Sequence, residues 1–220
     1  MPPVQQADSA QRKKISLTAF LLSMEIITVK VGILQTNCYI LKENGVAVII
    51  DPGAKVQRIL DALGDAQPLA ILLTHGHFDH IGAINDLLAV HALPIYLHPD
   101  DAELLKDPQL NYSFPKRFVV DVETQAYPNR LSIGPFAFEV IDTPGHTEGS
   151  VLLMIQDHLF SGDTLFHQSI GRTDLKTGNP THMKQSLRLI KTLHGPLTIW
   201  PGHDEPTTLA NELSSNPYLT

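Results

Sequence analysis

The sequence predicts an α/β (α+β) fold in which two β-sheets pack against each other and helices cover both outer faces. Runs typical of strands lead into a run typical of a helix twice, once in each half of the 220-residue chain. Residues 69–73 are all apolar, as expected for a strand that is covered on both faces. We expect residues 24–220 to form a single domain, and residues 1–23 to be a disordered leader or extension.

The first half of the chain is expected to alternate strands and helices. Glu43-Asn44-Gly45 separates two β-rich runs and predicts a hairpin turn. Apolar residues recur at helical spacing over residues 54–63, and Gly64 ends that helix. The predicted strands are residues 25–31, 37–41, 46–50, 69–73 and 94–97, and the predicted helices are residues 54–63, residues 81–91 and a segment that starts at residue 99.

The second half returns to this pattern after an irregular stretch. Residues 107–130 hold three prolines and several aromatic residues, so we expect loops that line a site. The predicted strands that follow are residues 136–141, 151–155, 158–161 and 197–200, and the predicted helices are residues 181–193 and 206–216.

A cluster of metal-binding residue types follows the apolar strand at residues 69–73. The segment Thr74-His75-Gly76-His77-Phe78-Asp79-His80 holds three histidines and an aspartate within six residues. Imidazole and carboxylate groups are common ligands of zinc and related metals. Four such groups on a turn at the end of a buried strand predict a metal site at the edge of a sheet.

Three more candidate ligands, His146, Asp163 and His203, each follow a strand-like run and a glycine that can bend the chain. Taken singly, each of the three is equally well explained as an ordinary surface or core residue. Together with the first cluster they make seven ligands, too many for one tetrahedral ion but suited to two. The remaining histidines lack such a setting and are predicted to be solvated or structural: His91, His98, His158, His167, His182 and His194.

These motifs, taken together, resemble the metallo-β-lactamase superfamily. The resemblance rests on residues 74–80, Pro-Gly-His at 144–146, Gly-Asp at 162–163 and Pro-Gly-His at 201–203, in this order. It implies the four-layer αβ/βα sandwich of that family. Residues 169–175, 207–212 and 216–217 also resemble the small glyoxalase II-like (hydroxyacylglutathione hydrolase-like) metallohydrolases within it.

The resemblance implies two metal ions, most often zinc, with iron or manganese as alternatives. Asp163 is implied to bridge the ions, and Asp79 is implied to orient the nucleophile as a catalytic residue. The implied ligands are His75, His77 and His146 for one ion and Asp79, His80 and His203 for the other.

Two further residues have two interpretations each. Asp51 resembles an aspartate that supports a ligand in this family, but it is equally explained as a plain turn residue in Asp-Pro-Gly. Arg172 is a candidate for binding a substrate carboxylate, and a structural ion pair with Asp174 is the alternative.

The function that the resemblance implies is hydrolysis of an acyl thioester of the hydroxyacylglutathione type, by attack of a hydroxide that bridges two metal ions. A thiolate leaves with little help from an acid, since the pKa of a thiol is about 8.5. Three alternatives stay open: a persulfide dioxygenase with one iron bound by His75, His146 and Asp163, a lactonase or other ester hydrolase on the same fold, and a non-catalytic metal-binding module. Full-length glyoxalase II carries an extra helical domain that supplies basic residues for glutathione. The sequence shows no counterpart, so recognition of glutathione stays open.

Composition narrows the partners. The formal net charge is −7 and no basic stretch is typical of nucleic-acid binding, so we expect a small-molecule substrate and no nucleic acid. No apolar run reaches the 18 residues of a membrane span, so we expect no membrane partner. Cys38 is the only cysteine; it is predicted to be buried on a strand and fits a cytoplasmic location. Nothing in the sequence sets an oligomeric state.

Overall fold

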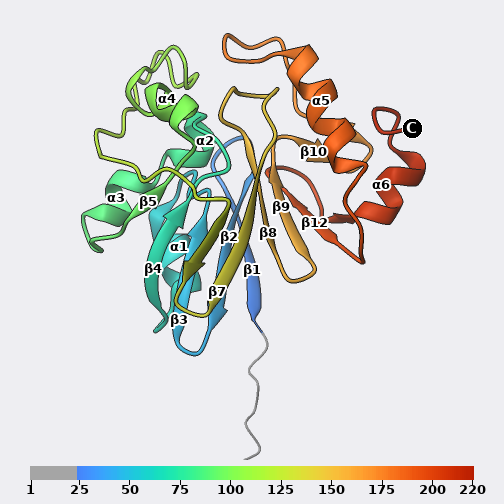
Figure 1. Cartoon of the computed structure of the whole chain (residues 1–220). Coiled ribbons are helices and arrows are strands. Elements are labelled where there is room, and N and C mark those ends of the chain that lie inside the picture. Colours follow the sequence, from blue (N-terminus) through green and yellow to red (C-terminus); the bar gives the residue numbers. More distant parts are fainter. Residues whose placement is uncertain (1–23) are drawn as a thin grey trace, which may run out of the picture.

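The structure is a computed structural model that describes residues 24–220. Residues 1–23, for which we predicted a disordered leader or extension, lie outside the described residues. Two β-sheets stack in the middle of the molecule, and helices cover their outer faces (Figure 1). The predicted α/β fold class and its four-layer αβ/βα sandwich are confirmed.

The first sheet has five strands in the order β1-β2-β3-β4-β5. Short turns join the first three strands, which pair antiparallel, whereas β4 and β5 follow helical crossovers and pair parallel. The strands are β1 (Glu25–Val31), β2 (Thr36–Glu43), β3 (Val46–Ile50), β4 (Gln67–Leu72) and β5 (Ile95–Tyr96).

The second sheet has six strands in the order β13-β12-β9-β8-β7-β6. Strands β6 to β9 form an antiparallel meander, and β12 pairs parallel to β9 after a helical crossover. These strands are β6 (Arg130–Ile133), β7 (Phe136–Asp142), β8 (Val151–Ile155), β9 (His158–Gly162), β12 (Thr198–Pro201) and β13 (Thr207–Thr208). A separate hairpin joins β10 (Leu165–Phe166) to β11 (Ser169–Ile170).

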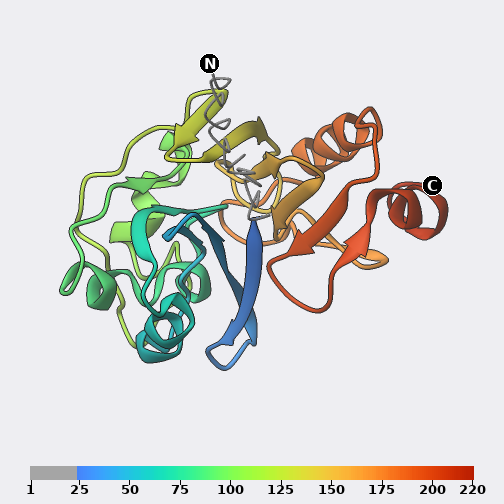
Figure 2. The same cartoon turned by 90° about the horizontal axis from the view of Figure 1, so that it is seen from below.

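Helices are divided between the two outer faces, and Figure 2 shows the blue-green helices on one side and the orange and red helices on the other. The first sheet is covered by α1 (Val56–Leu63), α2 (Phe78–Ile81), α3 (Ile84–Leu88), the 3₁₀ turn η1 (Pro99–Asp101) and α4 (Ala102–Lys106). The second sheet is covered by α5 (Pro180–Ile190) and α6 (Leu209–Ser215). Among residues 24–220, no helix has the length and apolar character needed to cross a membrane.

Three apolar clusters hold these layers together. Side chains such as Tyr39, Phe138 and Phe160 fill the space between the sheets. On β4, Leu72 points into that space, and its neighbour Ile71 packs under the helices on the other face. Both faces of β4 are therefore covered, which explains why its last residues are all apolar and confirms that prediction.

One predicted helix is wrong. In place of a helix over residues 81–91, the chain forms the two short helices α2 and α3, and Asp79 and His80 lie on α2 instead of a turn. The break follows Gly82, which lies so close to the end of β3 that a Cβ there would sit 2.2 Å from the Gly53 carbonyl oxygen. This close approach fixes α2 against the strand end. We also did not predict β6, the β10–β11 hairpin or β13, which are too short for a clear alternating pattern.

Candidate metal centre

The seven predicted metal ligands meet at one edge of the two sheets. Helix α2 contains Asp79 and His80, and β10 follows Asp163 in the sequence. Both elements lie at the upper edge of the sheets in Figure 1. Each ligand follows the end of a strand: His75, His77, Asp79 and His80 follow β4, His146 follows β7, Asp163 follows β9 and His203 follows β12.

Ligand atoms of the cluster converge in three overlapping groups, each within 4.8 Å. The groups are His75, His77 and His146; His75, His80 and Asp163; and Asp79, His80 and His203.

Asp163 lies between the two ends of the cluster, with His146 at one end and His80 and His203 at the other. Its Oδ1 is 3.4 Å from Nε2 of His80, and its Oδ2 is 3.5 Å from Nε2 of His146 and 3.4 Å from Nε2 of His203. Gly202 makes room for this carboxylate, since a Cβ there would lie 2.2 Å from Asp163 Oδ1. The geometry suits the bridging role that we predicted for Asp163.

Backbone carbonyls orient two of the imidazoles. His146 Nδ1 donates to the Arg172 carbonyl at 2.8 Å, and His203 Nδ1 donates to the Leu34 carbonyl at 3.2 Å. A carbonyl oxygen can only accept, so the hydrogen of each neutral ring lies on Nδ1. The Nε2 lone pair of both rings then faces the cluster, as a metal ligand requires.

Asp51 orients two more ligands. The Thr74 hydroxyl donates to Asp51 Oδ2 at 2.6 Å, so its oxygen accepts from His75 Nδ1 at 3.1 Å. His80 Nδ1 lies 2.9 Å from the same Asp51 oxygen, and the Thr74 amide donates to Oδ1 at 2.8 Å. Asp51 therefore contacts one ligand directly and a second through Thr74, which favours the supporting role over that of a plain turn residue.

The sequence reasoning missed Asp101, a fully buried carboxylate in η1. Its Oδ2 accepts from the Gly76 amide at 2.9 Å and the Thr147 hydroxyl at 2.8 Å, and its Oδ1 accepts from the Gly149 amide at 2.8 Å. Burial raises the pKa of Asp101, against the effect of these donors. Asp101 thus ties the loop of His75 and His77 to the loop of His146. The available signal was its place just after β5, at the same sheet edge as the ligands.

Charge is distributed unevenly across the cluster. Burial opposes protonation of His80, yet the carboxylates of Asp79 and Asp163 raise its pKa well above the usual value. Burial also opposes protonation of His203, yet hydrogen bonds to Asp163 and Asp79 raise its pKa to about 10. By contrast, burial and the neighbouring His146 lower the pKa of His77 to about 3. His80 and His203 therefore balance the carboxylates as cations, while His77 is neutral.

The residues fit metal ions. Buried polar atoms of the cluster that have no hydrogen-bond partner include His75 Nε2, His80 Nε2 and Asp163 Oδ1. Buried polar atoms are normally satisfied, so these point to a group that the cluster binds. His77 Nδ1 and His146 Nε2 also lie 2.9 Å apart, which brings two nitrogen ligands together. Imidazole and carboxylate donors suit zinc, iron and manganese alike.

A cavity of about 470 Å³ opens over the cluster. Besides five of the ligands, it is lined by Leu34, Phe78, Tyr112, Arg172 and Leu175. The Arg172 guanidinium pairs with Asp174 through two hydrogen bonds of 2.8 Å, and both side chains are largely exposed. The residue touches the cluster through its carbonyl oxygen, and its predicted contact with a substrate stays a prediction.

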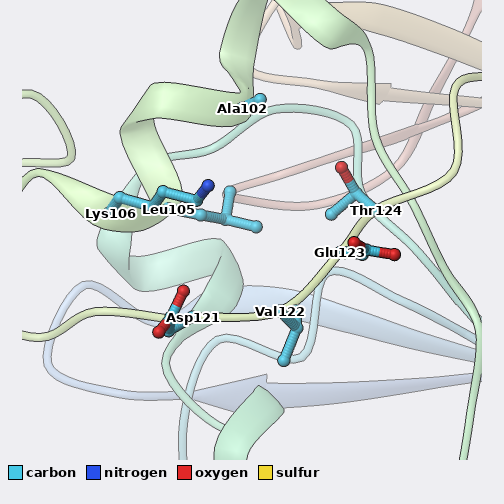
Figure 3. A pocket seen from close by; sticks show the side chains of 7 residues that line it. All are labelled: Ala102, Leu105, Lys106, Asp121, Val122, Glu123 and Thr124. Carbon is cyan, nitrogen blue, oxygen red and sulfur yellow. The ribbon is translucent and has the colours of Figure 1, made fainter.

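Another cavity, of about 480 Å³, lies away from the cluster between α4 and residues 121–124 (Figure 3). Its lining comprises Ala102, Leu105, Lys106 and those four residues, and it includes no candidate ligand. Size alone therefore does not mark the reactive site.

Residues predicted to be structural stay outside the ligand groups. His98 accepts from the Asp100 amide at 3.2 Å and His158 accepts from Trp200 Nε1 at 3.1 Å. The other four histidines without a motif setting also lie outside the groups of converging ligands among residues 24–220. Cys38 is fully buried on β2, as predicted.

Comparisons with known proteins agree with this site. Residues 31–203 match the family described as the metallo-beta-lactamase superfamily. The chain is 38% identical over 202 residues to the probable metallo-hydrolase YqgX of Bacillus subtilis (strain 168), covering 86% of this chain and 94% of the relative. It is 32% identical over 213 residues to hydroxyacylglutathione hydrolase GloC of Haemophilus influenzae, covering 89% and 98%.

Two solved structures share the fold over most of the chain. The crystal structure of BLEG-1 B3 metallo-beta-lactamase has a TM-score of 0.84 at 38% identity, covering 89% of this chain and 100% of that chain. The crystal structure of TTHA1623 in a di-iron-bound form has a TM-score of 0.80 at 34% identity, covering 88% and 100%. The family match, the similarity over nearly the whole described chain and the arrangement of the cluster lead to one conclusion: this chain belongs to the metallo-β-lactamase superfamily.

Proposed function

We propose that this protein is a hydrolase that uses two metal ions to cleave an acyl thioester of the hydroxyacylglutathione type. The observation that carries the proposal is the position of Asp163 between two converging sets of ligands. The names of the relatives YqgX and GloC and the di-iron form of TTHA1623 support it.

One ion would be held by His75, His77 and His146, and the other by Asp79, His80 and His203, with Asp163 shared. When bound, such ions lower the pKa of water to near neutrality and polarise a carbonyl group. Zinc is our first choice because the donors are nitrogen and oxygen, and iron or manganese would take the same set.

Asp79 would orient the attacking water. Its Oδ2 accepts from the Thr36 hydroxyl at 2.7 Å and lies 3.3 Å from His203 Nε2, so the carboxylate is held in one orientation beside the cavity. Burial favours its neutral form, yet the charge on His80 lowers the pKa of Asp79 to about 2. An ionised, fixed carboxylate accepts a hydrogen bond from water but holds a proton poorly. A leaving thiolate suits such a site, because it needs no strong acid.

The second set of ligands also bears on the single-iron alternative. A persulfide dioxygenase would need only His75, His146 and Asp163, and would leave the convergence of Asp79, His80 and His203 without a role. That convergence favours two ions. A lactonase would use the same cluster, so only substrates separate it from a thioesterase.

The test is turnover by the zinc-loaded full-length protein on S-lactoylglutathione, followed as released thiol. We expect metal-dependent hydrolysis that His77→Ala abolishes and that His167→Ala, at an exposed histidine outside the cluster, leaves unchanged. Hydrolysis of lactones with no thioester turnover would contradict the proposal. Oxygen consumption on a persulfide by an iron-loaded form would replace it with the dioxygenase.

A further inference from the structure

A side pocket of about 490 Å³ adjoins the cavity over the metal ligands. The two cavities share Leu34, Phe78, Asp79 and Tyr112, so they lie next to each other. The side pocket extends away from the cluster between the turn at residues 32–34, the segment 53–55 and residues 112–118. Asp79, at the junction, is its only acidic residue and the only predicted metal ligand in it.

Large apolar side chains gather around the side pocket although water reaches them. Ile33, Leu34 and Phe114 are 84%, 50% and 59% exposed. They are three of the seven large exposed apolar residues among residues 24–220, and they come from two segments far apart in the sequence. Single exposed apolar residues are ordinary, but a group of them around one pocket is typical of a binding surface.

Two lysines border the same pocket. Lys55 lies just before α1 and Lys116 lies in the 112–118 segment, and both are exposed. Within the described part of the chain, neither ammonium group takes part in an ion pair or a side-chain hydrogen bond. In a chain with a formal net charge of −7, two such cations beside an apolar pocket complement an anion.

Tyr112 fixes the junction between the two cavities. Its backbone has φ 62°, a conformation that a bulky residue rarely adopts. The Lys176 amide donates to its hydroxyl oxygen at 2.6 Å, and its ring meets the His77 ring edge-on with centroids 5.5 Å apart. The ring is therefore fixed at the boundary between the two cavities, where it would contact a ligand that extends from the cluster into the side pocket.

We propose that the side pocket binds one arm of the substrate, and that this arm is apolar and ends in an anionic group such as a carboxylate. The inference rests on the proposed function, because it places the scissile thioester over the metal ligands. The apolar part of the arm contacts Ile33, Leu34 and Phe114, and its anionic end meets Lys55 and Lys116. The preferred substrate is therefore a thioester in which one arm has an apolar part and ends in an anionic group.

The test compares two matched series of thioesters with the zinc-loaded full-length protein. One series carries a six-carbon arm on the thiol side and the other carries it on the acyl side, and the arm ends in a carboxylate, a hydroxyl or a methyl group. In one of the two series, we expect kcat/KM to be about tenfold higher for the substrate with the carboxylate-ended arm than for the substrate with the hydroxyl-ended arm. The difference should come from a lower KM. Equal rates for the three ends in both series would overturn the proposal.

Variants locate the effect. The double variant Lys55→Met/Lys116→Met should lose the preference for the carboxylate-ended arm. Phe114→Ala should lower kcat/KM for every substrate with a six-carbon arm, but not for the S-acetyl thioester of 2-mercaptoethanol, which has no such arm. Lys191→Met and Leu189→Ala, at exposed positions outside both cavities, are the matched controls and should change neither. A carboxylate that binds at the metal cluster instead would keep its preference in the double lysine variant, which would also overturn the proposal.

Direct binding separates this inference from the proposed function. Thioether analogues, in which a methylene replaces the scissile carbonyl, are titrated calorimetrically into the zinc-loaded protein. Suppose that the protein does not hydrolyse thioesters but binds the carboxylate-ended analogue selectively, and that the double lysine variant loses this selectivity. The proposed function would then be wrong, and the assignment of the side pocket would be supported. Equal binding of the carboxylate-ended and hydroxyl-ended analogues would overturn the pocket whatever the turnover.

Discussion

Asp51 Oδ2 and His80 Nδ1 lie 2.9 Å apart, and both side chains are buried. The contact aims Nε2 of His80 at Asp79 and Asp163, which lie 3.5 and 3.4 Å away. It links the end of β3 to helix α2, so the geometry of one ligand depends on a strand that carries no ligand itself.

Replacing this carboxylate should weaken metal binding. In Asp51→Asn, the amide cannot accept from His80, Thr74 N and Thr74 Oγ1 together. We expect affinity for at least one ion to fall about 10- to 100-fold, as for other supports of metal ligands. Competition with a chromophoric chelator measures it, and Asp65→Asn, at an exposed aspartate, is the control. An unchanged affinity in Asp51→Asn would show that His80 is held by other contacts.

Asp101 should matter for stability as well as for the site. In Asp101→Asn, an amide replaces the carboxylate, and the NH2 group of the amide can only donate. The three groups that donate to Asp101 can then no longer all be satisfied, so we expect a loss of about 1–3 kcal/mol in the free energy of unfolding. Urea unfolding of the zinc-loaded protein measures this change. The adjacent Asp100→Asn is a matched control, since the Asp100 side chain is 64% exposed. Equal stabilities of the two variants would refute the link between the two ligand loops.

Metal binding should release protons from one end of the cluster. Without metal, the raised pKa of His80 and of His203, the latter to about 10, keeps both protonated at neutral pH. A ligand must be neutral to bind a metal, so these protons leave and apparent affinity falls as pH falls. His77, with its pKa lowered to about 3, releases none.

Calorimetric titration of zinc in two buffers with different ionisation enthalpies counts these protons. We expect two from the histidines, besides any from bound water, and about one fewer in His203→Ala. The same count in the variant as in the parent chain would mean that His203 is neutral before metal binds.

The architecture and the convergence of the seven candidate ligands were largely predictable because both rest on local sequence signals. Strand β3 at Val46–Ile50 was predicted to the residue, since a hairpin turn and Asp-Pro-Gly delimit it. His146, Asp163 and His203 could be found because each follows a strand end and a glycine. The ends of neighbouring strands meet in space, so signals scattered along the chain indicated one site.

Contacts made by backbone groups were beyond the sequence pattern. Asp101 receives hydrogen bonds from amides 25 and 48 residues away, and such partners leave no signature in residue types. We predicted that the Arg172 guanidinium binds substrate, whereas the structure shows that the carbonyl oxygen of this residue orients His146. The break between α2 and α3 depends on how closely Gly82 approaches Gly53, which only the packed fold reveals.

The number of metal ions that support thioester hydrolysis tests the central claim most directly. Metal-free protein is titrated with zinc, and both bound zinc per chain and the rate of thiol release from S-lactoylglutathione are measured at each step, alongside Asp163→Asn. The two-ion account predicts that activity approaches its maximum only as the second ion binds, and that Asp163→Asn loses both the second ion and the activity. Full thioester turnover with a single ion per chain would contradict it.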